Sequence, residues 1–201
     1  REAGGRVDWL RSGLAAGALV LAAKGLDKRV DREAARHEDS SNMKSFVKGA
    51  NALPVAALGL SAVFAFDDSR RQLSDTGVAA LEAGGLAFGA SVLLKEIAKR
   101  ERPDGSGDDA FPSRRTALMW AAVTPYAKEY DLPWLYGVAA LTNAARVGSR
   151  EHWLSDTVGG ALLGYALGRV TWEARRESRK DKRGPALSVG FNQVNAEWKF
   201  D

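Results

Sequence analysis

The stretch ARVGSREHWLSD, residues 145–156, places an arginine, a histidine and an aspartate at the spacing R-x5-H-x3-D between two apolar, alanine-rich segments. His152 and Asp156 are four residues apart. If a helix starts near His152, the carboxylate reaches the imidazole and fixes one tautomer, which leaves the other ring nitrogen free to act as a nucleophile. The alternative is that Asp156 caps the helix while His152 packs against Trp153.

The sequence on both sides of this stretch predicts an all-α helical bundle. Alanine and leucine dominate every apolar run, and proline and asparagine fall between the runs. The predicted helices cover residues 7–24, 27–38, 43–66, 76–99, 113 through the 120s, 132–147 and 155–179. Pro54 is expected to kink or divide the third helix. Gly160, Gly164 and Gly168 share one face of the last helix and should admit a closely packed neighbour.

The composition limits the classes of function that the chain can have. Its 201 residues, 45% hydrophobic and 27% charged, suffice for a domain with a substantial core. The net charge of +4 is a small difference between 29 basic and 25 acidic residues, so a nucleic-acid partner is not indicated. The absence of cysteine excludes thiol catalysis, disulfides and cysteine metal sites.

Two features bear on location. The chain begins at Arg1 rather than at a methionine, which predicts a mature, exported chain after removal of a leader. Only the uncharged run 49–66 approaches the length of about 20 residues that a spanning helix needs, and it contains Asn51 and Pro54. The apolar runs are therefore interpreted as core helices of a soluble protein.

The C-terminal residues follow a different pattern. After Gly184-Pro185, apolar residues alternate with polar ones on both sides of Asn192-Gln193. This alternation predicts a β-hairpin or an extended tail at 184–201, following a helical domain at 1–183.

The candidate anion-binding residues start with Lys95 and Arg102, which are seven residues apart in KEIAKRERP. They share one side if the helix persists to Arg102, but spacing alone favours surface cations. Ser113 in PSRRT precedes a predicted helix, so its hydroxyl and the first free N–H groups form either an anion site or an ordinary N-cap.

Together, K-x6-R-P, P-S-x-x and R-x5-H-x3-D stand in an order that resembles the type 2 phosphatidic acid phosphatase family. The family also includes bacterial acid phosphatases, lipid phosphate phosphatases and vanadium haloperoxidases. The resemblance covers residues 95–156 and implies an active site between helices. It implies that Lys95, Arg102 and Arg146 bind the phosphate oxygens, together with the Ser113 side chain and the Arg114 backbone N–H.

The resemblance also implies that His152 forms a phosphohistidine and that Asp156 orients it. The sequence departs from the family at Arg115, where the family has a histidine that protonates the leaving oxygen. Arginine stays charged and cannot donate that proton, so the general-acid function should be impaired. Arg115 is a crippling substitution, an adaptation to pyrophosphate-like leaving groups, or the mark of a phosphate-binding pseudoenzyme.

The resemblance favours a phosphorylated lipid or a small phosphate ester as substrate, at the periplasm or cell envelope, with peripheral membrane contact. It implies no cofactor and no metal, and vanadate should inhibit as a phosphate mimic. A haloperoxidase is one alternative, although it also uses the histidine that Arg115 replaces. A different class is an envelope protein that binds partners through its tail and the basic end of its last helix.

Overall fold

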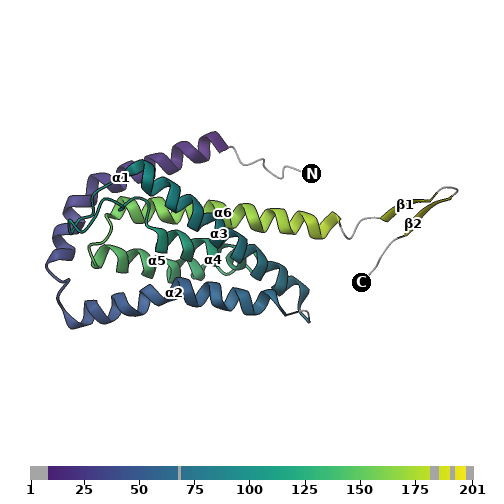
Figure 1. Ribbon diagram of the computed structural model, residues 1–201, viewed down its shortest axis with the longest axis horizontal. Helices are drawn as coiled ribbons and strands as arrows, with labels where there is room; N and C mark the ends of the chain where they lie inside the picture. The colour runs from purple at the N-terminus through teal and green to yellow at the C-terminus, as the bar shows by residue number, and fades with distance from the viewer. Residues whose placement is uncertain (1–8, 68, 182–185, 191–192, 198–201) are drawn as a thin grey trace.

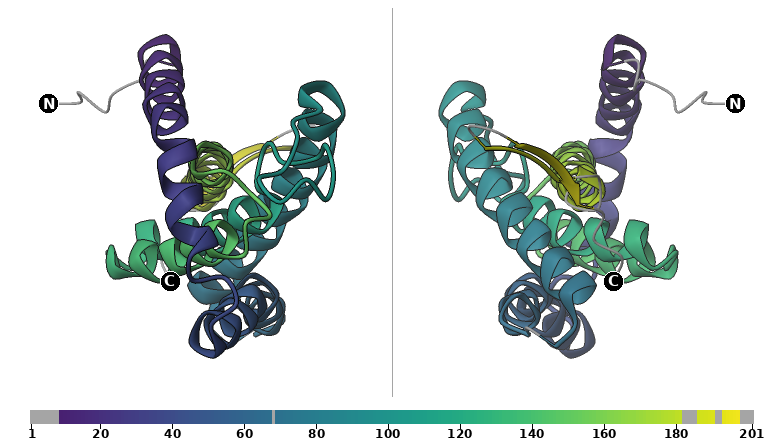
Figure 2. Two further views of the ribbon diagram at one scale, coloured as in Figure 1. Left: turned by 90° about the vertical axis from the view of Figure 1, so that its left-hand side faces the viewer. Right: turned by 90° about the vertical axis from the view of Figure 1, so that its right-hand side faces the viewer.

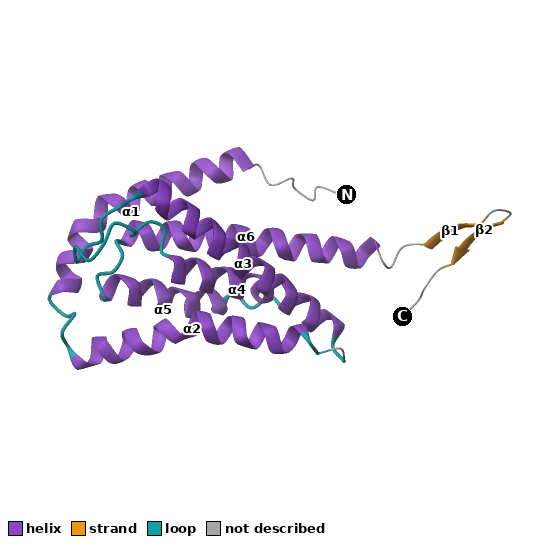
Figure 3. Ribbon diagram, in the orientation of Figure 1, coloured by secondary structure: helices purple, strands orange, loops and turns teal. Residues whose placement is uncertain are grey.

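The computed structural model describes residues 9–67, 69–181, 186–190 and 193–197, which form a bundle of long helices followed by a two-stranded hairpin (Figures 1 and 3). The elements are α1 (Trp9–Ala35), α2 (Ser41–Ala65), α3 (Arg71–Ala98), α4 (Arg114–Glu129), α5 (Trp134–Gly148), α6 (Leu154–Asp181), β1 (Ala186–Gly190) and β2 (Gln193–Glu197). The predicted all-α bundle is confirmed.

The direction of successive helices brings the predicted site residues to one end of the bundle. Helices α3 and α5 end where α4 and α6 begin, at the left in Figure 1. We call this end, with the loops 99–113 and 149–153, the motif end. The connections at 66–70 and 130–133 lie at the far end. Residues that are distant in sequence therefore lie close together, and several helix ends contribute to the site.

Small residues let the central helices approach closely. Helix α6 lies between α1 and α3 (Figure 2) and packs along α4. A Cβ atom added at Gly160 would lie 2.5 Å from the Ser113 carbonyl oxygen, and one added at Gly168 would lie 2.7 Å from the Cβ of Thr124. The close contact predicted for the glycine stripe is confirmed, and it fixes α6 against the start of α4.

The N-terminal half corrects two predictions about where helices begin and end. In place of separate helices at 7–24 and 27–38, one continuous helix, α1, covers residues 9–35, because no residue between 24 and 27 breaks the helical backbone. Residues 36–38 lie in the turn that follows it. Ser40 caps α2, with its hydroxyl accepting a hydrogen bond from the Met43 N–H at 3.2 Å. Pro54 is accommodated inside α2 and does not divide it.

The interpretation of the apolar runs as buried core helices is wrong for α2. Helices α2 and α3 are long and apolar enough to cross a membrane, and only 17% and 39% of their most hydrophobic windows are buried in the described structure. Val55, Val63 and Phe66 on α2 are 74%, 66% and 84% exposed. An apolar helix surface of this extent is typical of contact with lipid rather than with water.

The C-terminal prediction of a hairpin is confirmed over the described residues. Strands β1 and β2 pair antiparallel, with Val189 opposite Val194 and Leu187 opposite Ala196. The predicted boundary at residue 184 and part of the predicted turn lie outside the described residues.

Candidate active site

The three predicted phosphate-binding cations lie around His152. Lys95 is in the last turn of α3, Arg146 is near the end of α5, and Arg102 is in the loop that follows α3. Lys99 adopts a left-handed conformation with φ 39° and ends α3, close to the predicted end at residue 99, so the condition that the helix persists to Arg102 is not met. The loop, rather than helical periodicity, brings Arg102 back toward Lys95.

His152 is buried, and its imidazole is held by the loop between α3 and α4. Its Nδ1 lies 2.6 Å from the Ala110 carbonyl oxygen. A carbonyl oxygen only accepts hydrogen bonds, so Nδ1 carries the proton and Nε2 of the neutral ring has the free lone pair. Burial, followed by the charges of Arg146, Lys95 and Arg102, lowers the pKa of His152 to about 3. The imidazole is therefore neutral at physiological pH.

Asp156 does not orient this histidine directly, which corrects the prediction. Its Oδ2 accepts a hydrogen bond from the Trp153 backbone N–H at 2.8 Å, and its Oδ1 accepts one from Arg100 at 2.6 Å. These contacts match the capping alternative. Asp156 fixes the backbone directly after His152, so its effect on the imidazole passes through the chain.

Arg100, which the sequence analysis did not single out, connects α1 to this loop. Its guanidinium also donates to Asp27 at 2.7 Å and to the Ser155 hydroxyl at 2.7 Å. Asp27 is 4% exposed and accepts hydrogen bonds from both the N–H and the hydroxyl of Ser155. Helix α1 thus supplies a buried carboxylate that holds the start of α6.

A second arginine makes a parallel connection. Arg150 donates to Asp31 at 2.8 Å and to Glu38 at 3.3 Å, so the loop before His152 is tied to α1 as well. Sequence reasoning missed these contacts because the acidic residues of α1 lie more than a hundred positions before the loop. A run of charges on a helix does not indicate which distant residues those charges will contact.

The side chains of the segment PSRR differ in burial, since the serine is buried and the two arginines are exposed. Ser113 is fully buried at the start of α4, and its hydroxyl accepts a hydrogen bond from Thr116 at 3.0 Å. No side chain caps α4, so the N–H groups of its first turn remain available to an anion. Arg114 is exposed, with its guanidinium 5.1 Å above the Phe88 ring. Arg115 is also exposed and lies close enough to Arg146 for the two charges to repel.

The cations are linked to one another by two carboxylates. Asp109 lies between Lys95 and Arg102, with its oxygens 3.3 Å from Lys95 Nζ and 2.7 Å from Arg102 Nε. Glu151 accepts a hydrogen bond from Arg146 Nη2 and lies 3.9 Å from Arg102. Hydrogen bonding from Arg102 lowers the pKa of Asp109 to about 2, against the effect of its partial burial.

Arg146 retains unused binding capacity. It is 2% exposed and donates to Asn51 of α2 at 3.0 Å, yet its Nε has no hydrogen-bond partner among the described residues. A buried donor without a partner is costly and is commonly explained by a ligand. The site therefore has more cationic donors than its own carboxylates can satisfy.

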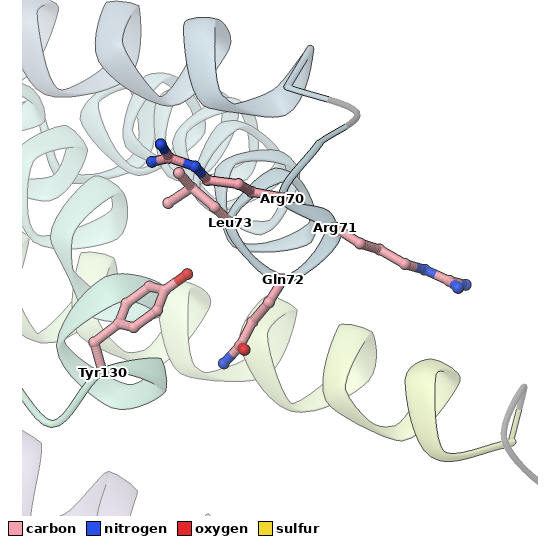
Figure 4. A pocket seen from close by; sticks show the side chains of 5 residues that line it. All are labelled: Arg70, Arg71, Gln72, Leu73 and Tyr130. Atoms are coloured by element: carbon pink, nitrogen blue, oxygen red, sulfur yellow. The ribbon is translucent and has the colours of Figure 1, made fainter. Parts of the chain in front are cut away.

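A cavity of about 470 Å³ lies at the far end, lined by Arg70, Arg71, Gln72, Leu73 and Tyr130 (Figure 4). The Arg71 side chain extends away from Tyr130 in this view. None of the residues that converge on His152 lines this cavity, so cavity size alone does not locate the chemistry.

The site thus combines a neutral, buried imidazole with three cations and an uncapped helix start, all at one end of a helical bundle. The model of the PAP2 superfamily matches residues 76–180, which is more than half of the chain. The chain belongs to this superfamily.

Individual relatives agree with this assignment. Lipid A 1-phosphatase from Porphyromonas gingivalis is 36% identical over a region that covers 51% of this chain and 28% of the relative. The chain thus spans little more than a quarter of that relative's length.

Two solved structures share the fold. The transmembrane PAP2-type phosphatidylglycerolphosphate phosphatase from Bacillus subtilis superposes with a TM-score of 0.62 at 19% identity, over 84% of this chain and 96% of that one. LpxE from Aquifex aeolicus gives 0.53 at 18% identity, over 74% and 95%.

Proposed function

We propose that this protein is a lipid phosphatase that works through a phosphohistidine on His152. The observation that carries the proposal is the convergence of Lys95, Arg102 and Arg146 on a neutral imidazole whose Nδ1 is occupied by Ala110. A phosphoryl group in transfer keeps dispersed negative charge, which fixed cations and helix N–H groups stabilise.

In the first step, Nε2 of His152 attacks phosphorus and the bond from phosphorus to the leaving oxygen breaks. The hydrogen bond from Nδ1 to the Ala110 carbonyl oxygen stabilises the positive charge that the ring acquires. In the second step, water attacks phosphorus, the N–P bond breaks, and phosphate leaves with a proton released to solvent. The proposed mechanism uses no metal, and orthovanadate should inhibit by occupying the same position.

Arg115 determines which leaving groups this site handles well. Its guanidinium is exposed in the first turn of α4 and near Arg146, where it adds positive charge but has no proton to give. An alkoxide needs that proton, whereas the phosphate expelled from a pyrophosphate does not. Activity should therefore fall far less for pyrophosphates than for alkyl monoesters.

The relatives and the apolar surface together favour a lipid substrate at a membrane. The names of the relatives refer to lipid A and phosphatidylglycerolphosphate. The exposed apolar faces of α2 and α3 lead to the motif end, since α3 carries Lys95 in its last turn. We propose that these helices contact the bilayer while the motif end lies at its surface, on the periplasmic or outer side of the cell envelope.

The test measures phosphate release from an aryl phosphate, an alkyl lipid monophosphate and a lipid pyrophosphate in detergent micelles. His152→Ala should abolish release, with a loss of about a thousandfold or more. Arg115→His should raise turnover of the alkyl lipid monophosphate by about 100-fold, because it restores a general acid. His37→Ala is the matched control, since His37 is exposed in the turn after α1 and should be dispensable.

The outcomes separate the alternatives. If the natural chain is less active than Arg115→His by the same factor on pyrophosphates and on alkyl esters, the explanation by leaving group is wrong. If neither the natural chain nor Arg115→His releases phosphate, the protein is a phosphate-binding member of the family that acts through partners. Halide oxidation by the vanadate-loaded protein would indicate the haloperoxidase alternative.

A further inference from the structure

The partners of the three site cations form a chain of alternating charge. In order, it runs Lys95, Asp109, Arg102, Glu151, Arg146. Each cation of the proposed phosphate site is thus already in contact with a carboxylate oxygen. The donors involved are Lys95 Nζ, Arg102 Nε and Arg146 Nη2, which are also the groups that would bind phosphate oxygens.

Exposure distinguishes the two kinds of partner. The Arg146 and Lys95 side chains are 2% and 11% exposed, whereas those of Glu151 and Asp109 are 32% and 46% exposed. The Arg102 side chain is 23% exposed, so each of the three cations is less exposed than the carboxylate that it contacts. The carboxylates lie in the loops 99–113 and 149–153, so they can turn toward solvent while the helices stay in place.

We propose that Asp109 and Glu151 compete with phosphate for the three cations and thereby set the affinity of the site for anions. This inference rests on the proposed function, because it assumes that Lys95, Arg102 and Arg146 bind the phosphate. A carboxylate and a phosphate oxygen use the same N–H donors, so one must release a donor before the other can take it. The carboxylates also hold three mutually repelling cations together.

The competition predicts a gain of affinity when a carboxylate is neutralised. Glu151→Gln keeps the size of the side chain but removes the charge that opposes a phosphate beside Arg146 and Arg102. Asp109→Asn does the same between Lys95 and Arg102. Each change should lower the Kd for phosphate by about tenfold. This value takes the interaction of two charges at close range and reduces it for solvent screening, because the carboxylates are partly exposed.

The experiment is isothermal titration of the full chain in detergent with inorganic phosphate. Glu151→Gln and Asp109→Asn are compared with the natural chain and with two matched controls, Glu96→Gln and Asp108→Asn. Both control residues are exposed carboxylates next to a site residue in sequence, and they should change the Kd less than twofold. Tighter binding cannot arise from misfolding, so the predicted gain reports on the site itself.

Lys95→Ala and Arg146→Ala separate failure of this inference from failure of the proposed function. If they lose phosphate binding while Glu151→Gln and Asp109→Asn bind as the natural chain does, or more weakly, the competition is disproved and the phosphate site stands. If Lys95→Ala and Arg146→Ala bind phosphate like the natural chain, the cation site fails, and the inference fails with it. Equal gains in the control variants would also overturn it.

Discussion

The two ends of the bundle both contain buried ion pairs, but the balance of charge differs between them. At the far end, the Glu129 side chain is 8% exposed and accepts hydrogen bonds from Gln72, Trp172 and Arg179. There one carboxylate is saturated by several donors. At the motif end, three cations share two partly exposed carboxylates, and the buried Arg146 Nε has no hydrogen-bond partner in the described part of the chain. An excess of donors, rather than the presence of buried charge, therefore distinguishes the end to which we assign the phosphate site.

The largest expected difference between the two ends comes from removing one arginine at each end and comparing activity and stability. Arg146→Ala should lower kcat/KM by about 100-fold or more, because it deletes a buried cation from the proposed phosphate site. Arg179→Ala, the control at the far end, should lower the thermal midpoint while kcat/KM of the folded protein stays the same. Arg146→Lys checks that the effect is not a folding defect, since it keeps the charge but loses the bidentate geometry. Similar kinetic losses at both ends would contradict the distinction.

The connection from α1 to the motif end gives a smaller effect. Asp27→Asn removes the charge that pairs with Arg100 at 2.7 Å and should destabilise the fold by about 3 kcal/mol. We expect kcat to fall about tenfold with little change in KM, because the start of α6 loses its support while the cations remain. The measurements are phosphate-release kinetics and thermal unfolding in detergent. A change in KM alone would mean that Asp27 affects binding rather than the position of His152.

At the far end, Glu129→Gln should affect stability only. The change leaves the partly buried Arg179 guanidinium without its charged partner at 2.8 Å and should cost about 2 kcal/mol. The thermal midpoint should fall, and kcat/KM below that midpoint should match that of the natural chain. A loss of activity in the folded variant would show that the two ends are coupled.

The last prediction concerns the protonation state of His152, which should not change over the physiological pH range. Because its pKa in the folded protein is about 3, the ring should stay neutral from pH 8 to pH 5, as measured from its nitrogen chemical shifts. The ordinary value in an unfolded chain is about 6.5. The unfolded state therefore binds more protons between these values, and stability should decline as the pH falls from 7 toward 3. His37→Ala assigns the signals, and a protonation midpoint near 6.5 would refute the buried, cation-surrounded environment.

The sequence allowed the prediction of the helices and of the residues that converge at the motif end. Periodicity reports which segments are helical, and the K-x6-R-P and R-x5-H-x3-D spacings are local patterns. The prediction failed for Asp156, because four-residue spacing is equally compatible with a cap, and only the backbone direction before α6 decides between the two. It also failed for α2, since an apolar helix has the same sequence whether protein or lipid covers it.

The residues that escaped prediction depend on contacts between distant segments. Asp27 and Arg100 are surface-like in sequence and meet only because α1 packs beside α6. Asp109 and Glu151 lie in loops whose paths no periodic pattern specifies. Their roles become visible once the donors of Arg102 and Arg146 are traced to their acceptors.

The position of Asp27 has a practical consequence for anyone who dissects this protein. The family match begins at residue 76, yet Asp27 and Asn51 lie before it and contact Arg100 and Arg146. A chain shortened to residues 76–180 would retain every signature residue and lose both of these supports. The signature residues are thus not a self-sufficient module, and a fragment that keeps both supports must extend back at least to α1.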